Sequence, residues 1–284
     1  FLNPGLTRNL RYKLGEYGHM NTRMKELENY GDVDCLVIGA SDAYRGFDPR
    51  IFSQSGIRIF NAGSSSQSPI QTEVLLNDCI KFLKPKRILY TVSHYTLTSD
   101  GVESAIDIVS NRRCDAASLL MVLKTLNIKP FNTMLYAIYR QVFGLDDDFH
   151  EPQETEEDVF VHGGFVQKKY SAFNTNSKMK LLGTSDSINV FQQNAFDRIV
   201  QIANENDVDL IFVKTPVAHY EQYCGLYGSI WEEVKAQLRK NGRFIDFNED
   251  EMAFEDSLHF YDQYHLNQTG VMKFNAMVID SLKK

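Results

Sequence analysis

Five short, almost wholly apolar runs alternate with helix-like segments along this chain, and this alternation restricts its fold more than any other feature. A nearly continuous apolar run is typical of a parallel strand that is covered on both faces of a sheet. Strands that alternate with helices predict one parallel sheet with helices packed on both sides. We therefore expect an α/β protein. The predicted strands are residues 33–38, 58–61, 87–92, 209–213 and 243–247.

Capping signals place helices between these strands. Asp48 followed by Pro49 predicts an N-cap and the first residue of a short helix. Ser68 and Gln71 have the spacing of a capping box, which predicts that a longer helix begins there. Asn241-Gly242 is typical of a helix end. Apolar periodicity or helix-like composition indicates further helices at residues 7–30, 188–204, 230–240 and 270–282.

The regular alternation breaks down between residues 99 and 183. This segment contains an apolar helical stretch at 116–143, then an acidic run, and then a Gly163-Gly164 turn. The chain has 284 residues, a length that suits one large α/β domain. We predict a single domain over residues 1–284 in which residues 99–183 form an insertion or cap.

The negative charge of the chain is concentrated in residues 146–158. The net charge is −7, and this run holds eight acidic residues with no Lys or Arg. The rest of the chain has 29 acidic residues against 30 basic ones. We therefore interpret the run as a solvated loop on a nearly neutral body. A neutral body with no basic block argues against nucleic acid or an anionic membrane surface as the main partner.

The four cysteines show neither a CxxC pair nor the spacing of a metal site. Cys35 and Cys79 lie in apolar segments and are predicted to be small buried residues, whereas a Cys114–Cys224 disulfide is left open. No apolar run reaches the 18 residues of a membrane span. Because the chain starts at Phe1, we expect that an N-terminal segment was removed, and a membrane anchor would belong to it. No cofactor is predicted.

In a parallel sheet, functional residues gather at the carboxyl ends of the strands. Ser41 directly follows the first strand and is the best nucleophile candidate, although the same residue would also suit a simple helix cap. The small-residue loop 61–68 follows the second strand and could point backbone N–H groups at a developing oxyanion.

His265 is the best candidate for the base that a serine nucleophile requires. Asp262 lies three residues before it, and an aspartate there can accept the Nδ1–H of the ring and fix its tautomer. The same spacing occurs in Asp256 and His259, so one of the two pairs must be a decoy. We favour His265 because the sequence after it begins the last helix.

With these blocks in order, the chain resembles the SGNH (GDSL-type) hydrolase superfamily. The resemblance rests on Gly39-Ala40-Ser41-Asp42, on the Asn61–Ser66 block and on Asp262-x-x-His265. The phrases around these blocks look like bacterial cell-envelope members related to polysaccharide and teichoic-acid O-acylation proteins. The matched blocks lie within residues 33–95 and 207–282.

The resemblance implies a flavodoxin-like, three-layer α/β/α sandwich and a Ser-His-Asp triad that acts on esters. Ser41 would be the nucleophile, His265 the base and Asp262 its orienting partner. The oxyanion donors would be the backbone N–H of Ser41 and one from the loop between Gly63 and Ser66.

The third block of the family departs from its usual pattern here. That block normally supplies an Asn side chain as an oxyanion donor, whereas this strand is followed by Ser93 and His94. Either of these residues would have to substitute, or one donor is missing. Loss of one donor can cost about 10²–10³ in rate. Weak hydrolysis would suit a transferase that prefers a sugar hydroxyl to water.

The leading hypothesis is a serine esterase or O-acyltransferase that acts on acylated carbohydrate or a cell-envelope polymer, with an extracytoplasmic location implied by the resemblance. The alternative is an SGNH-fold protein that binds carbohydrate or assists assembly and has lost catalysis. A third reading is a metal-dependent enzyme, although the spacing is wrong for a helical zinc motif. Its ligands would be Asp256, His259, Asp262 and His265.

Overall fold

The computed structural model describes residues 7–16, 18–169, 173, 187–249 and 253–283. Its main sheet has five strands, all parallel, in the order β2-β1-β3-β6-β7. Counted among the parallel strands alone, this is the 2-1-3-4-5 order of the flavodoxin-like folds. The predicted α/β class and all five strands are therefore confirmed. The bounds are β1 (Cys35–Ile38), β2 (Ile59–Asn61), β3 (Arg87–Thr91), β6 (Asp209–Lys214) and β7 (Arg243–Asp246).

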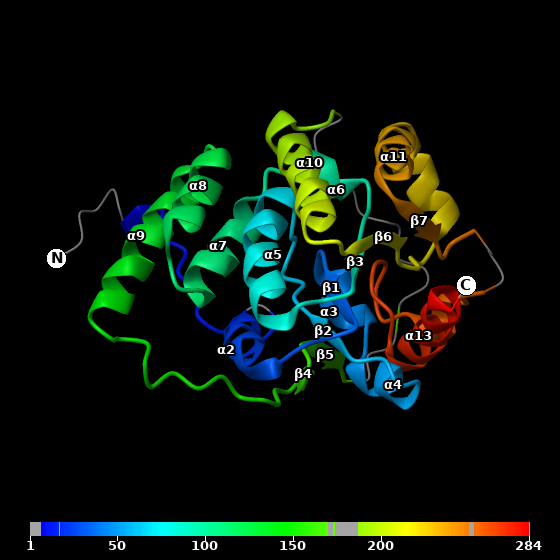
Figure 1. Ribbon diagram of the computed structural model, residues 1–284, viewed down its shortest axis with the longest axis horizontal. Coiled ribbons are helices and arrows are strands. Elements are labelled where there is room, and N and C mark those ends of the chain that lie inside the picture. The colour runs from blue at the N-terminus through cyan, green and yellow to red at the C-terminus, as the bar shows by residue number, and fades with distance from the viewer. Residues whose placement is uncertain (1–6, 17, 170–172, 174–186, 250–252, 284) are drawn as a thin grey trace.

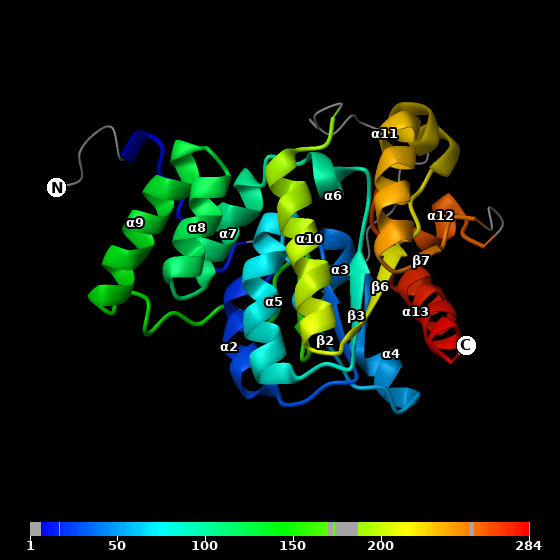
Figure 2. The same cartoon turned by 45° about the horizontal axis from the view of Figure 1, so that its top comes forward.

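Helices cover both faces of this sheet, because successive side chains of a strand point to opposite faces. Leu36 and Ile38 of β1 face one apolar core, whereas Cys35 and Val37 face the other. Figures 1 and 2 show the resulting layers around the central strands. The first core is covered by α2 (Met20–Tyr30), α5 (Pro69–Leu83), α10 (Val190–Glu205) and α11 (Tyr220–Asn241), and the second by α3 (Ser41–Gly46), α4 (Pro49–Gln54) and α13 (Gln268–Leu282).

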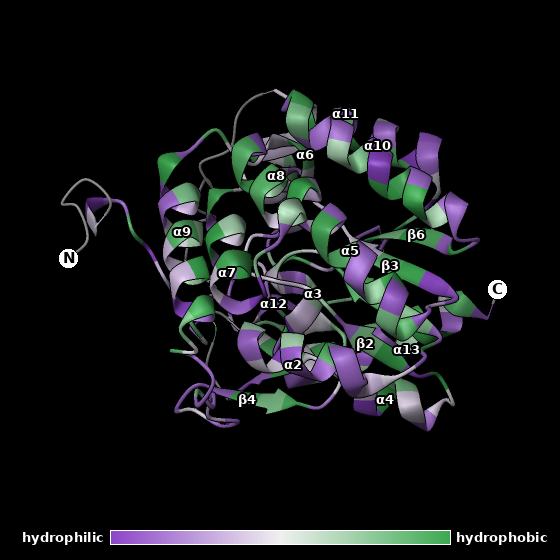
Figure 3. Ribbon diagram, turned by 60° about the vertical axis from the view of Figure 1, so that its left-hand side comes forward, coloured by the Kyte–Doolittle hydropathy of each residue, from purple (hydrophilic) through white to green (hydrophobic). Residues whose placement is uncertain are grey.

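The hydropathy of the elements matches these layers. In Figure 3, β3 and β6 are largely apolar, whereas α5 and α10 alternate between polar and apolar residues. Such alternation is expected of a helix with one buried and one solvated face. No helix among the described residues is both long enough and apolar enough to cross a membrane.

Three helix predictions need correction. Of the helix predicted at residues 7–30, the part from 20 to 30 forms α2, whereas residues 9–16 form turns and irregular chain. α11 begins at Tyr220, ten residues before the predicted start, and its added turns bury Tyr223 and Tyr227. The Ser68 side chain does not cap α5. It bonds instead to the side chains of Gln71 and Gln192, because Gln192 of α10 packs over this helix start. Asp48 caps α4 as predicted, accepting the backbone N–H of Arg50 at 3.0 Å.

The segment predicted as an insertion contains a hairpin that the sequence pattern did not reveal. β4 (Asp158–Val161) and β5 (Phe165–Lys168) pair antiparallel around the Gly163-Gly164 turn. Together with this hairpin, α7–α9 lie beside the main sheet (Figure 1), and residues 174–183 are outside the described part of the chain. The single-domain organisation stays a prediction. The helices of this segment are α7 (Val102–Asn111), α8 (Ala116–Lys124) and α9 (Ile128–Val142), which follow the short α6 (Tyr95–Thr98).

The acidic run is exposed over most of its length, in line with a solvated loop, but three of its eight acids are half-buried. Asp158 forms a bidentate ion pair with Arg45 of α3, with both N···O distances at 2.9 Å. The Glu151 side chain is only 3% exposed and accepts hydrogen bonds from Thr22. Glu151 and Asp158 pack against the body because it offers them partly buried donors. Cys35 and Cys79 are buried as predicted, and all four cysteines are free.

Candidate active site

The turn after β1 places Ser41 at the start of α3. Gly39 has a φ of 132°, and a Cβ atom there would lie 2.1 Å from Thr91 Oγ1 on β3. Only glycine therefore fits at this point, where two neighbouring strand ends meet. Its N–H donates to Gln67 Oε1 at 3.0 Å, which ties the turn to the loop after β2. Ser41 consequently lies at the carboxyl edge of the sheet, half-buried at the first position of a helix.

A tight loop between α12 (Asp256–His259) and α13 presents His265. Phe260 and Leu266 form an isolated antiparallel bridge across the base of this loop. Inside it, Asp262 Oδ1 accepts the backbone N–H groups of Tyr264 at 2.8 Å and His265 at 2.9 Å. The loop is thus shaped by the carboxylate itself, which fixes the position of His265 relative to Asp262.

Ser41, His265 and Asp262 are hydrogen-bonded in series. Ser41 Oγ lies 2.7 Å from His265 Nε2, and His265 Nδ1 lies 2.8 Å from Asp262 Oδ2. Partial burial acts to raise the pKa of Asp262, but its hydrogen bonds and charge interaction with His265 outweigh this and lower that pKa. Asp262 therefore stays ionised, holds the Nδ1–H of the ring and leaves Nε2 as the acceptor for the serine proton.

The second Asp-His spacing in the sequence does not form a pair. His259 Nδ1 accepts the backbone N–H of Glu255 at 2.9 Å, so this ring caps its own short helix. Asp256 bonds to His219 instead, with 2.6 Å between Oδ2 and Nδ1. The structure thus selects His265 over His259 as the partner of Ser41. The four proposed metal ligands do not come together: Asp256 bonds to His219, His259 bonds to a backbone N–H, and Asp262 bonds to His265. The described residues contain no cluster that could hold a metal ion.

Several of the predicted oxyanion donors are already engaged. The Gly63 N–H donates to Asn61 Oδ1 at 3.1 Å, and the Ser93 N–H donates to Thr96 Oγ1 at 2.9 Å. The backbone N–H groups of Ser41 and Ser66 donate to no other residue in the described part of the chain. Of the candidates, these two amides are therefore the ones free to meet an oxyanion.

His94 packs into the core behind the site. Its ring stacks on Tyr227 with centroids 3.6 Å apart, and its Nδ1 lies 3.0 Å from the Tyr223 hydroxyl. That hydroxyl accepts the His94 backbone N–H, so its own proton points to Nδ1. Burial, with the positive charge of Lys214, lowers the pKa of His94 to about 3, which leaves the ring neutral with its hydrogen on Nε2. Within the described residues, this ring forms no hydrogen bond with Ser41 or His265.

Asp42 is a supporting residue whose role the sequence left unassigned. Its two carboxylate oxygens accept hydrogen bonds from Thr91 Oγ1 at 2.9 Å and Thr215 Oγ1 at 3.0 Å. These threonines end β3 and follow β6, so Asp42 clamps the first turn of α3 across the sheet edge. Its position directly after a strand-end serine was the available signal.

Arg23 holds the loop after β2 by hydrogen bonds, and nothing in the local sequence indicates this role. The side chain is fully buried in α2 and donates to the carbonyl oxygens of Gly63 at 2.8 Å and Gly18 at 2.7 Å. It also donates to Gly164 in the β4–β5 turn at 3.0 Å. One buried guanidinium therefore joins the candidate oxyanion loop to the hairpin of the predicted insertion.

No protein-family model matches this sequence, and no curated protein is significantly similar to it. Among solved structures, a GDSL-like lipase from Bacteroides thetaiotaomicron is similar at 12% identity over 98% of this chain and 94% of its own, with a TM-score of 0.42. A psychrotrophic esterase from Pseudoalteromonas is similar at 12% identity over 88% of this chain and 97% of its own, with a TM-score of 0.42. A family 3 carbohydrate esterase from Clostridium thermocellum is similar at 12% identity over 88% of this chain and 96% of its own, with a TM-score of 0.38.

At this level of similarity, neither the activity nor the substrate of those proteins can be inferred for this chain. The chain's own features are the 2-1-3-4-5 parallel sheet and the Ser41-His265-Asp262 series at its carboxyl edge. By these features the chain has the α/β/α fold predicted from its resemblance to the SGNH hydrolases.

Proposed function

We propose that this protein is a serine ester hydrolase or acyltransferase that uses Ser41, His265 and Asp262 as its catalytic triad. The proposal is carried by one observation, the 2.7 Å contact between Ser41 Oγ and His265 Nε2 in a ring oriented by Asp262. A serine hydroxyl becomes nucleophilic when such an oriented base can take its proton.

The reaction follows from this geometry in two steps. Ser41 Oγ attacks the ester carbonyl carbon while His265 Nε2 takes the hydroxyl proton, and the resulting oxyanion is bonded by the N–H groups of Ser41 and Ser66. His265 then gives the proton to the leaving alkoxide, and the C–O bond of the ester breaks to leave an acyl-serine. Water, or the hydroxyl of an acceptor, then attacks the acyl carbon while His265 takes its proton. The bond between that carbon and Ser41 Oγ breaks, His265 returns the proton to Ser41 Oγ, and the acid or the new ester is released.

Tyr261 and Arg45 support this chemistry from the side. The Tyr261 ring stacks on the His265 ring with an angle of 7° between planes, and Arg45 lies 5.9 Å from the centre of Tyr261. These contacts limit rotation of the imidazole, which must keep Nε2 on Ser41 Oγ through both steps.

We propose an acylated carbohydrate or cell-envelope polymer outside the cytoplasm as the substrate, in line with the sequence resemblance.

A fluorophosphonate probe and p-nitrophenyl acetate test the proposal directly. We expect the probe to add to the peptide that contains Ser41, detected by mass spectrometry, and the acetate to be hydrolysed. Ser41→Ala should abolish both signals, whereas Ser53→Ala, a serine on the exposed side of α4, should leave both unchanged. Equal labelling of the wild type and Ser41→Ala would overturn the assignment. Added methanol or a sugar would separate transfer from hydrolysis, since transfer yields a new ester.

A further inference from the structure

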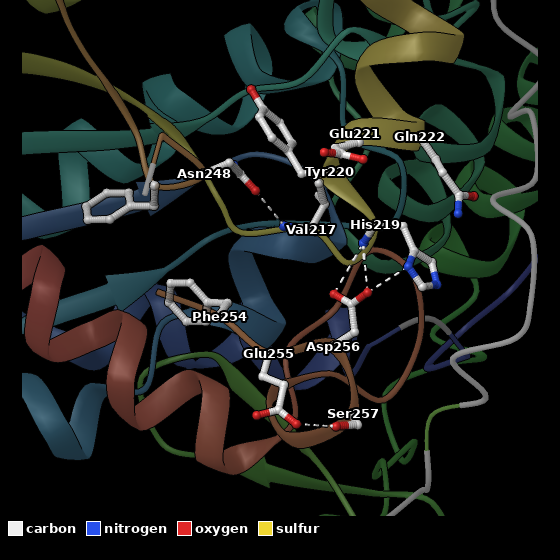
Figure 4. A pocket seen from close by; sticks show the side chains of 11 residues that line it. Val217, His219, Tyr220, Glu221, Gln222, Asn248, Phe254, Glu255, Asp256 and Ser257 are labelled. Carbon is white, nitrogen blue, oxygen red and sulfur yellow. Dashed lines mark hydrogen bonds and ion pairs between the residues drawn. The ribbon is translucent and has the colours of Figure 1, made fainter. Parts of the chain in front are cut away.

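A cavity of about 610 Å³ lies beside the loop that carries His265 and Asp262. It is formed where α11, α12 and the ends of β6 and β7 meet. Figure 4 shows Val217, Tyr220 and Glu221 on one wall and Phe254 with Asp256 on the facing wall. None of the triad residues lines this cavity, so it is a separate feature from the hydrogen-bonded series described above.

The cavity is nevertheless joined to the triad loop. The backbone N–H of Ala218, next to Val217 in the cavity wall, donates to the carbonyl oxygen of Gln263 at 3.1 Å. Gln263 lies between Asp262 and His265. β6 is two strands from β1 in the sheet, and neighbouring strands are about 4.8 Å apart, so their ends are separated by roughly 10 Å. A substrate whose carbonyl meets Ser41 can therefore reach the cavity with the part beyond its ester bond.

The lining of the cavity defines what it can bind. The half-buried Phe254 supplies aromatic surface, and the carboxylates of Glu221, Glu255 and Asp256 supply hydrogen-bond acceptors. Carboxylates accept hydrogen bonds from hydroxyl and amine groups, and they repel phosphate and carboxylate ligands. No Lys or Arg is among the described lining residues, and the basic ring of His219 there is already bonded to Asp256, so the lining carries more acidic than basic side chains.

Glu221 is the acceptor that is most available. It is exposed at the start of α11, and its carboxylate forms no hydrogen bond or ion pair with another described residue. By contrast, Asp256 is held by the backbone N–H and the ring of His219, and Glu255 accepts from Ser257 Oγ at 2.6 Å. The wall is thus fixed by internal hydrogen bonds while one acceptor remains open to a ligand.

We propose that this cavity binds the alcohol portion of the ester substrate, and that this portion is a polyhydroxylated chain without negative charge, such as a neutral or amine-bearing oligosaccharide. Its hydroxyl groups donate to the acidic side chains, and the C–H face of a sugar ring packs on Phe254, as polar and aromatic groups do in ligand pockets generally. The inference rests on the proposed function, because it assumes that the acyl group lies at Ser41.

Binding can be measured without catalysis on the Ser41→Ala protein. We expect calorimetry to detect binding of xylohexaose and of a chitosan hexamer, but not of a hexagalacturonate. Glu221→Lys should weaken binding of the two ligands at least tenfold. Glu233→Lys, an equally exposed site on α11 outside the cavity, is the matched control and should bind as Ser41→Ala does. The inference is wrong if neither ligand binds, if hexagalacturonate binds equally well, or if the two lysine variants behave alike.

Activity then separates this inference from the proposed function. With otherwise intact protein, Glu221→Lys should lower the ratio of kcat/KM for O-acetylated xylohexaose to kcat/KM for p-nitrophenyl acetate about tenfold, and Glu233→Lys should keep the wild-type ratio. An unchanged ratio in Glu221→Lys would reject the cavity as a substrate site while the esterase stands. A wild-type protein that neither hydrolyses p-nitrophenyl acetate nor reacts with the fluorophosphonate would reject the esterase, whatever the hexamers do.

Discussion

Replacing Asp262 with Asn tests the triad most sharply, because it changes the tautomer of His265 and little else. In the structure, Asp262 Oδ1 accepts two backbone N–H groups, and Oδ2 lies 2.8 Å from His265 Nδ1. An Asn can keep the two backbone bonds with its carbonyl oxygen, but it then presents an NH₂ group to Nδ1. That contact favours the tautomer with hydrogen on Nε2, which donates to Ser41 and cannot accept its proton.

The size of the effect follows from this loss of the base. A triad whose histidine is held in the wrong tautomer loses about 10⁴ in kcat, which corresponds to about 5.5 kcal/mol of transition-state stabilisation. Stability should change far less, by less than about 1 kcal/mol, because the side chain is 44% exposed and the backbone bonds survive. A large loss of rate with little loss of stability is therefore the expected signature.

The measurements are the rate of p-nitrophenol release and the midpoint of thermal unfolding. Asp280→Asn is the matched control, because Asp280 is an exposed carboxylate whose one ion pair among the described residues is with Lys283. It should keep the wild-type rate. If Asp262→Asn retained more than about a tenth of the wild-type rate with an unchanged melting temperature, the assigned role of Asp262 would be refuted.

Three further results are expected. His265→Gln should abolish ester hydrolysis. In His259→Gln, the rate per folded molecule should stay within about threefold of the wild-type rate, with the folded fraction measured by circular dichroism. Equal losses in the two variants would contradict the choice of His265. Gly39→Ala should lower the free energy of unfolding in urea by more than about 2 kcal/mol, since the added methyl group meets Thr91, and an unchanged midpoint would contradict that crowding. Burial raises the pKa of Asp107 to about 8, so the folded protein binds an extra proton between about pH 4 and pH 8 and stability should fall as pH rises through that window. Asp107→Asn should flatten this fall in urea titrations at pH 5 and pH 8, and parallel slopes for both proteins would argue against a buried neutral acid.

Local pattern was sufficient to predict the sheet and the position of Ser41, the proposed nucleophile. Strands β1, β2, β3 and β6 are buried on both faces over almost their whole length, so their apolar runs are visible without knowledge of their neighbours, whereas the edge strand β7 is only half-buried. Parallel strands also bring their carboxyl ends to one edge, and this rule placed Ser41 and the His265 loop near one another before any contact was known.

The sequence pattern did not predict the elements that depend on contacts between distant segments. The β4–β5 hairpin is short and mixed in composition, and it is held by Arg23 and by the Arg45–Asp158 pair. The early turns of α11 contain residues of modest helix propensity, and they form because Tyr223 and Tyr227 are buried. In both cases tertiary packing outweighs the local preference.

The choice between the two Asp-His pairs belongs wholly to the tertiary structure. Both have the same spacing, so the sequence could nominate Asp262 with His265 but could not exclude Asp256 with His259. The decision lies in bonds between residues far apart in the chain: Ser41 and His265 are separated by 224 positions, and His219 and Asp256 by 37. The sequence thus determined which chemical groups meet at the sheet edge, and only the folded chain determined which of them bond, because a hydrogen bond requires a distance and direction that spacing along the chain does not encode.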